Sequence, residues 1–131
     1  MCDLISNTDT RLIYVGGAGS LYVDKDTMLY ETKDFPEIYL PIAKAQVETY
    51  FDLKKREDVN WTFISPAIDF KLDGERTGQY ILAGEYLTFS SNGKSEISYE
   101  DYAIALVDEI EKGNHIKERI SVVWKYFFSN I

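Results

Sequence analysis

The pattern of apolar and polar residues predicts short strands that alternate with two helices. An apolar run at residues 12–15 stops at a glycine-rich segment, 16–19. Because the run is apolar on both faces, it is typical of a buried strand. Apolar residues then recur at three-to-four spacing after Pro41, which suits the first turn of a helix. This pattern predicts a helix over 41–56.

The middle of the chain favours strands. Apolar residues alternate with polar ones over 59–64, which predicts a strand that ends at residues 65–66. Two further segments, 80–82 and 86–89, have the composition of short strands, and a turn signal follows them at 91–93. We therefore expect a short β-hairpin in this region.

The second helix has clear ends. Ser98 suits the cap of its first turn, with Asp101 three residues on, and Gly113 suits the position just after its last turn. The helix is predicted to reach Lys112. Three apolar residues at helical spacing are predicted to face inward: Tyr102, Leu106 and Ile110.

A last strand is predicted at 120–124, where apolar residues alternate, and Phe127 and Phe128 follow in an apolar tail. With 131 residues, the expected organisation is a single domain, 1–131. The alternation of strands and helices argues for an α/β fold in which helices cover a largely parallel sheet.

Charge and cysteine content narrow the classes of function. The formal net charge of −8 repels phosphate backbones, so we expect no nucleic-acid partner. The single cysteine, Cys2, argues against a disulfide framework or a cysteine-rich metal site and favours the cytoplasm. The N-terminal residues lack the pattern of a signal peptide, and the apolar runs are far shorter than the ~18 residues of a membrane span. We therefore expect neither a metal nor a membrane partner.

Few residues are candidates for catalysis. His115 follows the predicted end of the second helix and is interpreted as a loop histidine. With one histidine and one cysteine, a zinc site or a catalytic triad has little support. Tyr39 and Lys44 are five positions apart with Pro41 between them, which does not place both on one helical face. No catalytic residue is therefore assigned.

Two loops are candidates for binding. The glycine cluster at 16–19 follows a predicted strand, but no helix begins after it, so it does not match a phosphate-binding fingerprint. It is either a tight turn or a turn that lets a ligand approach the backbone. Ser20 and the segment 65–67 each follow a predicted strand, where open α/β sheets bind ligands. The two loops are expected to line one crevice, although ordinary turn chemistry also accounts for them.

Six segments in this order resemble the atypical short-chain dehydrogenases described as NAD(P)H-binding proteins or NADH-flavin reductases. The segments are RLIYVGGAGSL (11–21), DFP (34–36), WTFISPA (61–67), GERTGQY (74–80), ISYEDYA (97–103) and LVDEIE (106–111). The similarity covers nearly the whole chain from Arg11.

The resemblance implies a Rossmann-like, doubly wound fold that binds NAD(P)H and reduces a flavin or a similar acceptor. Hydride transfer depends on contact between rings more than on a titratable side chain. By position, the residues expected near the cofactor are Gly17 and Ser20, with Ser65, Pro66 and Ala67 flanking the nicotinamide. Arg76 and Tyr80 are expected on the acceptor side.

The resemblance is to the C-terminal half of the family fold, because no glycine-rich phosphate loop precedes Arg11. We therefore expect a truncated oxidoreductase whose chain alone binds NAD(P)H weakly or not at all. The alternative is a non-catalytic, self-associating protein of the same ancestry. A homodimer is expected because the first predicted strand would have an unpaired edge. The sequence does not distinguish NADH from NADPH as the cofactor.

Overall fold

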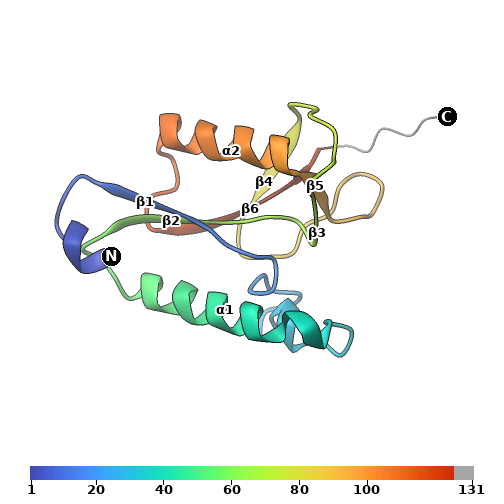
Figure 1. Ribbon diagram of the computed structural model, residues 1–131, viewed down its shortest axis with the longest axis horizontal. Helices are drawn as coiled ribbons and strands as arrows, with labels where there is room; N and C mark the ends of the chain where they lie inside the picture. Colours follow the sequence, from blue (N-terminus) through green and yellow to red (C-terminus); the bar gives the residue numbers. More distant parts are fainter. Residues whose placement is uncertain (126–131) are drawn as a thin grey trace.

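A computed structural model describes residues 1–125, so the predicted apolar tail at Phe127 and Phe128 lies outside the described residues. The main sheet has the strand order β1-β2-β6-β4 (Figure 1). Its strands are β1 (Arg11–Val15), β2 (Asn60–Ser65), β6 (Glu118–Trp124) and β4 (Tyr80–Ala83). Strands β1, β2 and β6 are parallel, and β4 runs antiparallel to β6. The predicted α/β class with a largely parallel sheet is confirmed.

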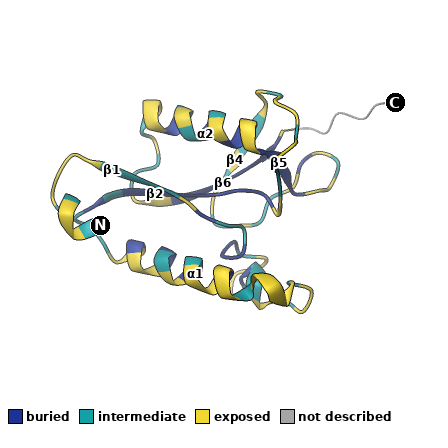
Figure 2. Ribbon diagram, viewed as in Figure 1, coloured by how far each residue is buried: buried dark blue, intermediate teal, exposed yellow. Residues whose placement is uncertain are grey.

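Two helices cover opposite faces of this sheet: α1 (Leu40–Lys54) and α2 (Tyr99–Lys112) (Figure 1). Each turns a buried side toward the strands and an exposed side toward solvent (Figure 2). Tyr50 of α1 packs with Trp61 and Phe63 of β2, whereas Tyr102 of α2 packs with Ile64. Among residues 1–125, no helix combines the length and the apolar composition that crossing a membrane requires.

Local capping signals explain the helix ends. Pro41 is the second residue of α1, and the Ser98 hydroxyl accepts a hydrogen bond from the Asp101 backbone N–H at 3.1 Å. Gly113 ends α2 with a left-handed backbone, φ 60°. The prediction that Ile110 faces inward is wrong, since its side chain is 53% exposed. Glu109 occupies the buried position beside it because a hydrogen-bond network compensates its charge.

The predicted hairpin is absent from the described residues. Strand β4 pairs with β6, and segment 86–89 forms no strand. The chain turns away after β4 because the Glu85 carboxylate accepts hydrogen bonds from Tyr50 and Arg119. Tyr86 then forms an isolated bridge with Tyr22. A second, two-stranded parallel sheet, which the sequence analysis missed, consists of β3 (Asp69–Lys71) and β5 (Glu96–Ser98).

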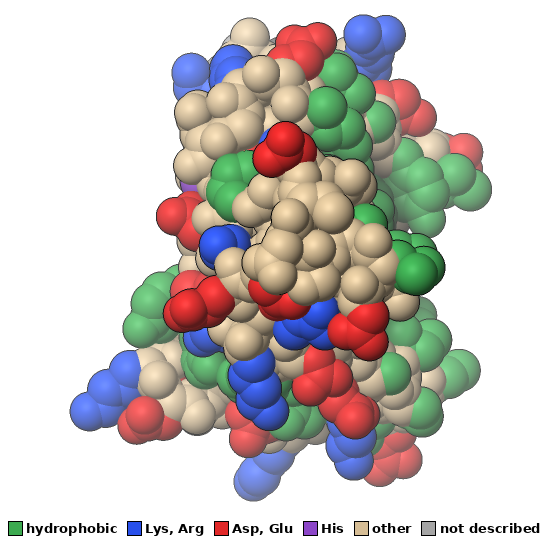
Figure 3. Space-filling model, turned by 90° about the vertical axis from the view of Figure 1, so that its left-hand side faces the viewer, with side chains coloured by type: hydrophobic (Ala, Val, Ile, Leu, Met, Phe, Trp, Pro, Cys, Tyr) green, Lys and Arg blue, Asp and Glu red, His purple; other side chains and the backbone are tan. Residues whose placement is uncertain are grey.

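Three short 3₁₀ helices complete the described elements: η1 (Cys2–Ile5), η2 (Leu29–Glu31) and η3 (Glu37–Tyr39). Near η1, acidic and basic side chains are interspersed on the surface (Figure 3). Arg56 pairs there with Asp3 at 3.0 Å and with Asp58 at 2.9 Å. These contacts attach η1 to the loop that precedes β2.

Candidate functional site

A cavity of about 640 Å³ opens at the carboxyl ends of β1 and β2. The loops after these strands form part of its wall, together with loop 29–36 and the first turns of α1. This is the edge of a parallel sheet at which open α/β folds bind ligands. Three of the predicted site residues line the cavity: Gly17, Pro66 and Ala67.

The cavity wall is mostly apolar. Of the described residues that line it, Asp34 alone is charged. Around the opening, Val15 is 51% exposed, Ile42 60% and Ile68 52%. Such a wall favours a flat, uncharged ring over a phosphate group.

The glycines after β1 let the backbone lie close against neighbouring side chains. A Cβ on Gly16 would lie 2.1 Å from Cε1 of Phe63, and one on Gly17 would lie 2.2 Å from Oε1 of Gln46. Neither glycine has a positive φ. The cluster is therefore explained by close approach of the loop to β2 and α1, rather than by a left-handed turn.

Ser20 and Ser65 do not line the cavity, but their buried side chains hold the two loops of its wall in place. Ser20 is 3% exposed and Ser65 0%. The Arg119 Nη1 atom donates to both hydroxyls, at 2.7 Å to Ser20 and 3.4 Å to Ser65. Its Nη2 atom donates to the Ser20 carbonyl at 3.0 Å and to Glu85 at 3.1 Å. Sequence reasoning missed Arg119, which immediately precedes the strand predicted at 120–124, although a charged residue beside an apolar strand was a usable signal.

Tyr50 completes this buried group. Its hydroxyl donates to Glu85 Oε1 at 2.6 Å, and its ring centre lies 4.5 Å from the Arg119 guanidinium carbon. Burial, followed by the hydrogen bond to Glu85, raises the pKa of Tyr50 above its ordinary value. Tyr50 therefore stays protonated at neutral pH and supports the carboxylate that pairs with Arg119.

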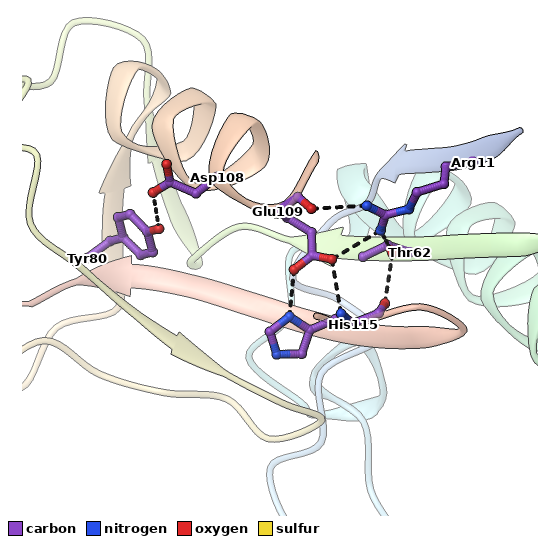
Figure 4. Close-up of polar contacts among 6 residues, drawn as sticks. All are labelled: Arg11, Thr62, Tyr80, Asp108, Glu109 and His115. Carbon is purple, nitrogen blue, oxygen red and sulfur yellow. Dashed lines mark hydrogen bonds and ion pairs between the residues drawn. The ribbon is translucent and has the colours of Figure 1, made fainter. Parts of the chain in front are cut away.

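Arg76 and Tyr80 lie beside α2 and do not line the cavity. The Tyr80 hydroxyl donates to Asp108 (Figure 4). Burial, followed by this hydrogen bond, raises the pKa of Tyr80 to about 12. Arg76 borders a shallow hollow over α2, next to Glu100 and Ile104. Their assignment to an acceptor side stays a prediction.

His115 belongs to a network that links α2 to β1 and β2 (Figure 4). Glu109 is 3% exposed and accepts hydrogen bonds from the His115 backbone N–H and from Arg11, both at 3.0 Å. The His115 Nδ1 atom lies 2.6 Å from the same carboxylate, and Arg11 also donates to Thr62 Oγ1 at 2.6 Å. Burial opposes ionisation of Glu109, but these hydrogen bonds outweigh it and lower its pKa. Within residues 1–125, no three His, Cys, Asp or Glu side chains are grouped to hold a metal ion.

No family model matches the chain. The uncharacterized protein YwnB of Bacillus subtilis is 48% identical over 116 residues, which are 87% of this chain and 54% of YwnB. A crystal structure of SP1627 from Streptococcus pneumoniae, described as "a putative NADH-flavin reductase", is 57% identical, with a TM-score of 0.91. That match covers 94% of this chain and 60% of SP1627.

A Rossmann-fold NAD(P)-binding family protein from Shigella flexneri matches 92% of the chain at 20% identity and a TM-score of 0.52, which shows the fold alone. The chain spans just over half the length of YwnB and 60% of SP1627. The predicted Rossmann-like fold and the predicted resemblance to NAD(P)H-binding, flavin-reductase-like oxidoreductases are both confirmed.

Proposed function

We propose that this chain forms the ring-binding part of an NAD(P)H-dependent, flavin-reductase-like oxidoreductase. The observation that carries the proposal is the apolar cavity of about 640 Å³ at the carboxyl ends of β1 and β2. The 57% identity to SP1627 supports this choice of ligand class. The nicotinamide or flavin ring is the part of the ligand that the cavity fits.

The residues of the cavity fit a ring better than a whole dinucleotide. Gly17 would face one part of the ring with its backbone, and Pro66 and Ala67 would supply an apolar wall. Phe35 and Ile42 would exclude water from it. When bound, the reduced nicotinamide supplies the hydride, and the chain's own residues hold and orient the ring.

The diphosphate group of NAD(P)H would meet no cationic side chain among the described residues of the cavity wall, and the acidic Asp34 lies there. The net charge of −8 also opposes an anionic ligand. We therefore propose that the chain alone binds NAD(P)H weakly.

A pair of opposite charges at one position tests the site. Ile42 lines the cavity and is 60% exposed, so the fold should tolerate Ile42→Lys and Ile42→Asp. We expect Ile42→Lys to tighten the binding of NADH and Ile42→Asp to weaken it, each by roughly threefold. Riboflavin carries no phosphate, so its affinity should not follow the sign of the charge.

The affinities can be measured by calorimetry with NADH, NADPH, FMN, FAD and riboflavin. His115→Ala serves as the control, since His115 lies in the network on α2 and not in the cavity wall, and it should leave binding unchanged. The proposal fails if none of these ligands binds at millimolar concentration. It also fails if His115→Ala abolishes binding while both Ile42 variants bind like the original protein.

We also propose that the protein forms a homodimer, which the alternative function of a self-associating protein requires. In the described sheet, β1 pairs with β2 and has no strand on its other side. Val15, at the end of β1, and Ile68, in the cavity wall after β2, are exposed apolar residues on the surface around the cavity. A second copy that pairs with β1 would cover both the edge and part of this apolar surface.

A further inference from the structure

Arg119 connects three segments that are distant in the sequence. It lies on β6, beside Phe63 of β2, and its side chain is fully buried. Its hydrogen bonds reach Ser20 after β1, Ser65 at the end of β2, and Glu85 after β4. One side chain of β6 thus joins both loops of the cavity to each other and to Glu85 after β4.

The two serines transmit this connection to the cavity wall. Ser20 directly follows the lining residue Gly19, and Ser65 directly precedes the lining residue Pro66. Arg119 contacts Ser20 through both its hydroxyl, at 2.7 Å, and its carbonyl, at 3.0 Å. The second contact holds the backbone itself, so the guanidinium restricts the loop and not only a side chain.

The charge of Arg119 is costly to bury. Its side chain is 0% exposed, and its Nε atom has no hydrogen-bond partner among the described residues. Glu85 supplies the compensating charge, and the ring of Tyr50 lies against the guanidinium. Buried ion pairs contribute little net stability compared with apolar side chains of similar volume. The observed arrangement therefore fits a geometric role better than a purely stabilising one.

We propose that Arg119 is the positioning residue of the cavity, holding the loops 16–20 and 65–67 at the separation that the ring ligand needs. This inference rests on the proposed function, because the ligand is the one proposed there. Arg119 acts through Ser20 and Ser65 and is not assigned contact with the ligand. The planar guanidinium reaches the two serine hydroxyls through Nη1, and the Ser20 carbonyl and Glu85 through Nη2. The ammonium of lysine has three N–H groups on one nitrogen and cannot make all four contacts.

The first test measures the loops in the absence of ligand. Arg119→Met keeps most of the side-chain volume and removes the charge, and Glu85→Gln in the same chain removes its partner charge. We expect this double variant to fold. Amide hydrogen exchange followed by mass spectrometry should be about tenfold faster in 16–20 and 65–67 than in the original protein. Exchange in α2 should be unchanged, and the original protein is the reference with slow loop exchange.

The second test measures affinity for riboflavin by quenching of its fluorescence. We expect the double variant to bind at least about tenfold more weakly than the original protein, and Arg119→Lys to show neither the original affinity nor slow exchange. If the double variant does not fold, Ser20→Ala combined with Ser65→Ala replaces it, with the same expected loosening and loss of affinity.

Unchanged exchange in a folded variant overturns the positioning role. Faster exchange with unchanged affinity overturns it as well. If the original protein binds no ligand, the proposed function fails, and the link between Arg119 and the ligand's geometry fails with it. The exchange measurement without ligand still shows whether Arg119 holds the two loops, so the two failures can be told apart.

Discussion

Asp101 accepts a hydrogen bond from the indole Nε1 of Trp124 at 2.7 Å, and both side chains are buried between α2 and the sheet. The same carboxylate accepts from the backbone N–H groups of Thr77 and Gly78, each at 2.9 Å. The spacing from Ser98 predicts a capping role for Asp101, yet its side chain instead anchors the loop before β4 to α2.

Removal of this carboxylate should destabilise the protein severely. Asp101→Ala leaves several buried donors without an acceptor, so we expect it to lower the free energy of unfolding by about 3 kcal/mol. Urea denaturation measures the change. Glu100→Gln, at the exposed neighbouring position, should cost less than about 1 kcal/mol. Equal costs for the two variants would contradict the anchoring role.

Two adjacent glycines should respond differently to one added methyl group. Gly16→Ala places its Cβ against the ring of Phe63, which is fixed in the core, and should cost about 2 kcal/mol of stability. Gly17→Ala meets only the end of the Gln46 side chain, which can turn away into the cavity. We expect it to keep the thermal midpoint within a few degrees and to weaken riboflavin binding. Loss of stability in both variants would show that the loop cannot adjust at Gly17.

Lowering the pH should reduce the contribution of Glu109 to the free energy of unfolding. Its pKa is lowered in the folded protein from the reference value of 4.5, so the unfolded chain takes up the proton first as the pH falls. The stabilisation is complete above about pH 4.5 and is lost as the pH falls through the lower, folded-state pKa. The difference in unfolding free energy between the original protein and Glu109→Gln should reach about 2 kcal/mol at pH 7 and narrow towards pH 3. Glu111→Gln, exposed on the same helix, should show no such narrowing.

Self-association should depend on the end of β1. Light scattering across a dilution series is expected to give twice the 15.1 kDa mass of one chain at tens of micromolar. Val15→Glu, at a position 51% exposed beside the cavity, should shift the protein to the monomer. Val107→Glu, at a position 48% exposed on α2, is the matched control and should remain dimeric. A cooperatively folded 15.1 kDa species in the original protein would exclude the dimer.

The sequence predicts best what local chemistry decides. Pro41, Ser98 and Gly113 mark helix ends by their own backbone and side-chain properties, and both helices lie within two residues of the prediction. The glycine cluster and Pro66 follow strands, which is sufficient to predict one crevice at the carboxyl edge of the sheet.

Contacts between distant residues could not be predicted in this way. Arg119 and its partner Ser20 are 99 positions apart, and the charge of Glu109 on α2 is compensated by His115 and by Arg11 of β1, which is 98 positions away. Strands β3 and β5 have three residues each, too few to show an alternating pattern. The burial of a charge or the pairing of a very short strand depends on partners that only the fold brings near.

The topology of the main sheet also determines when the chain can fold. The paired residues of its neighbouring strands are 38 or more positions apart, and β2 has one of its two neighbours in residues 118–124. Long loops must therefore close before the sheet is stabilised, which favours folding on the millisecond-to-second scale rather than the microsecond scale. During synthesis on the ribosome, β1 and β2 emerge well before β6. The inner edge of β2 stays open to other chains until β6 arrives, and only then does Arg119 bring the two cavity loops together.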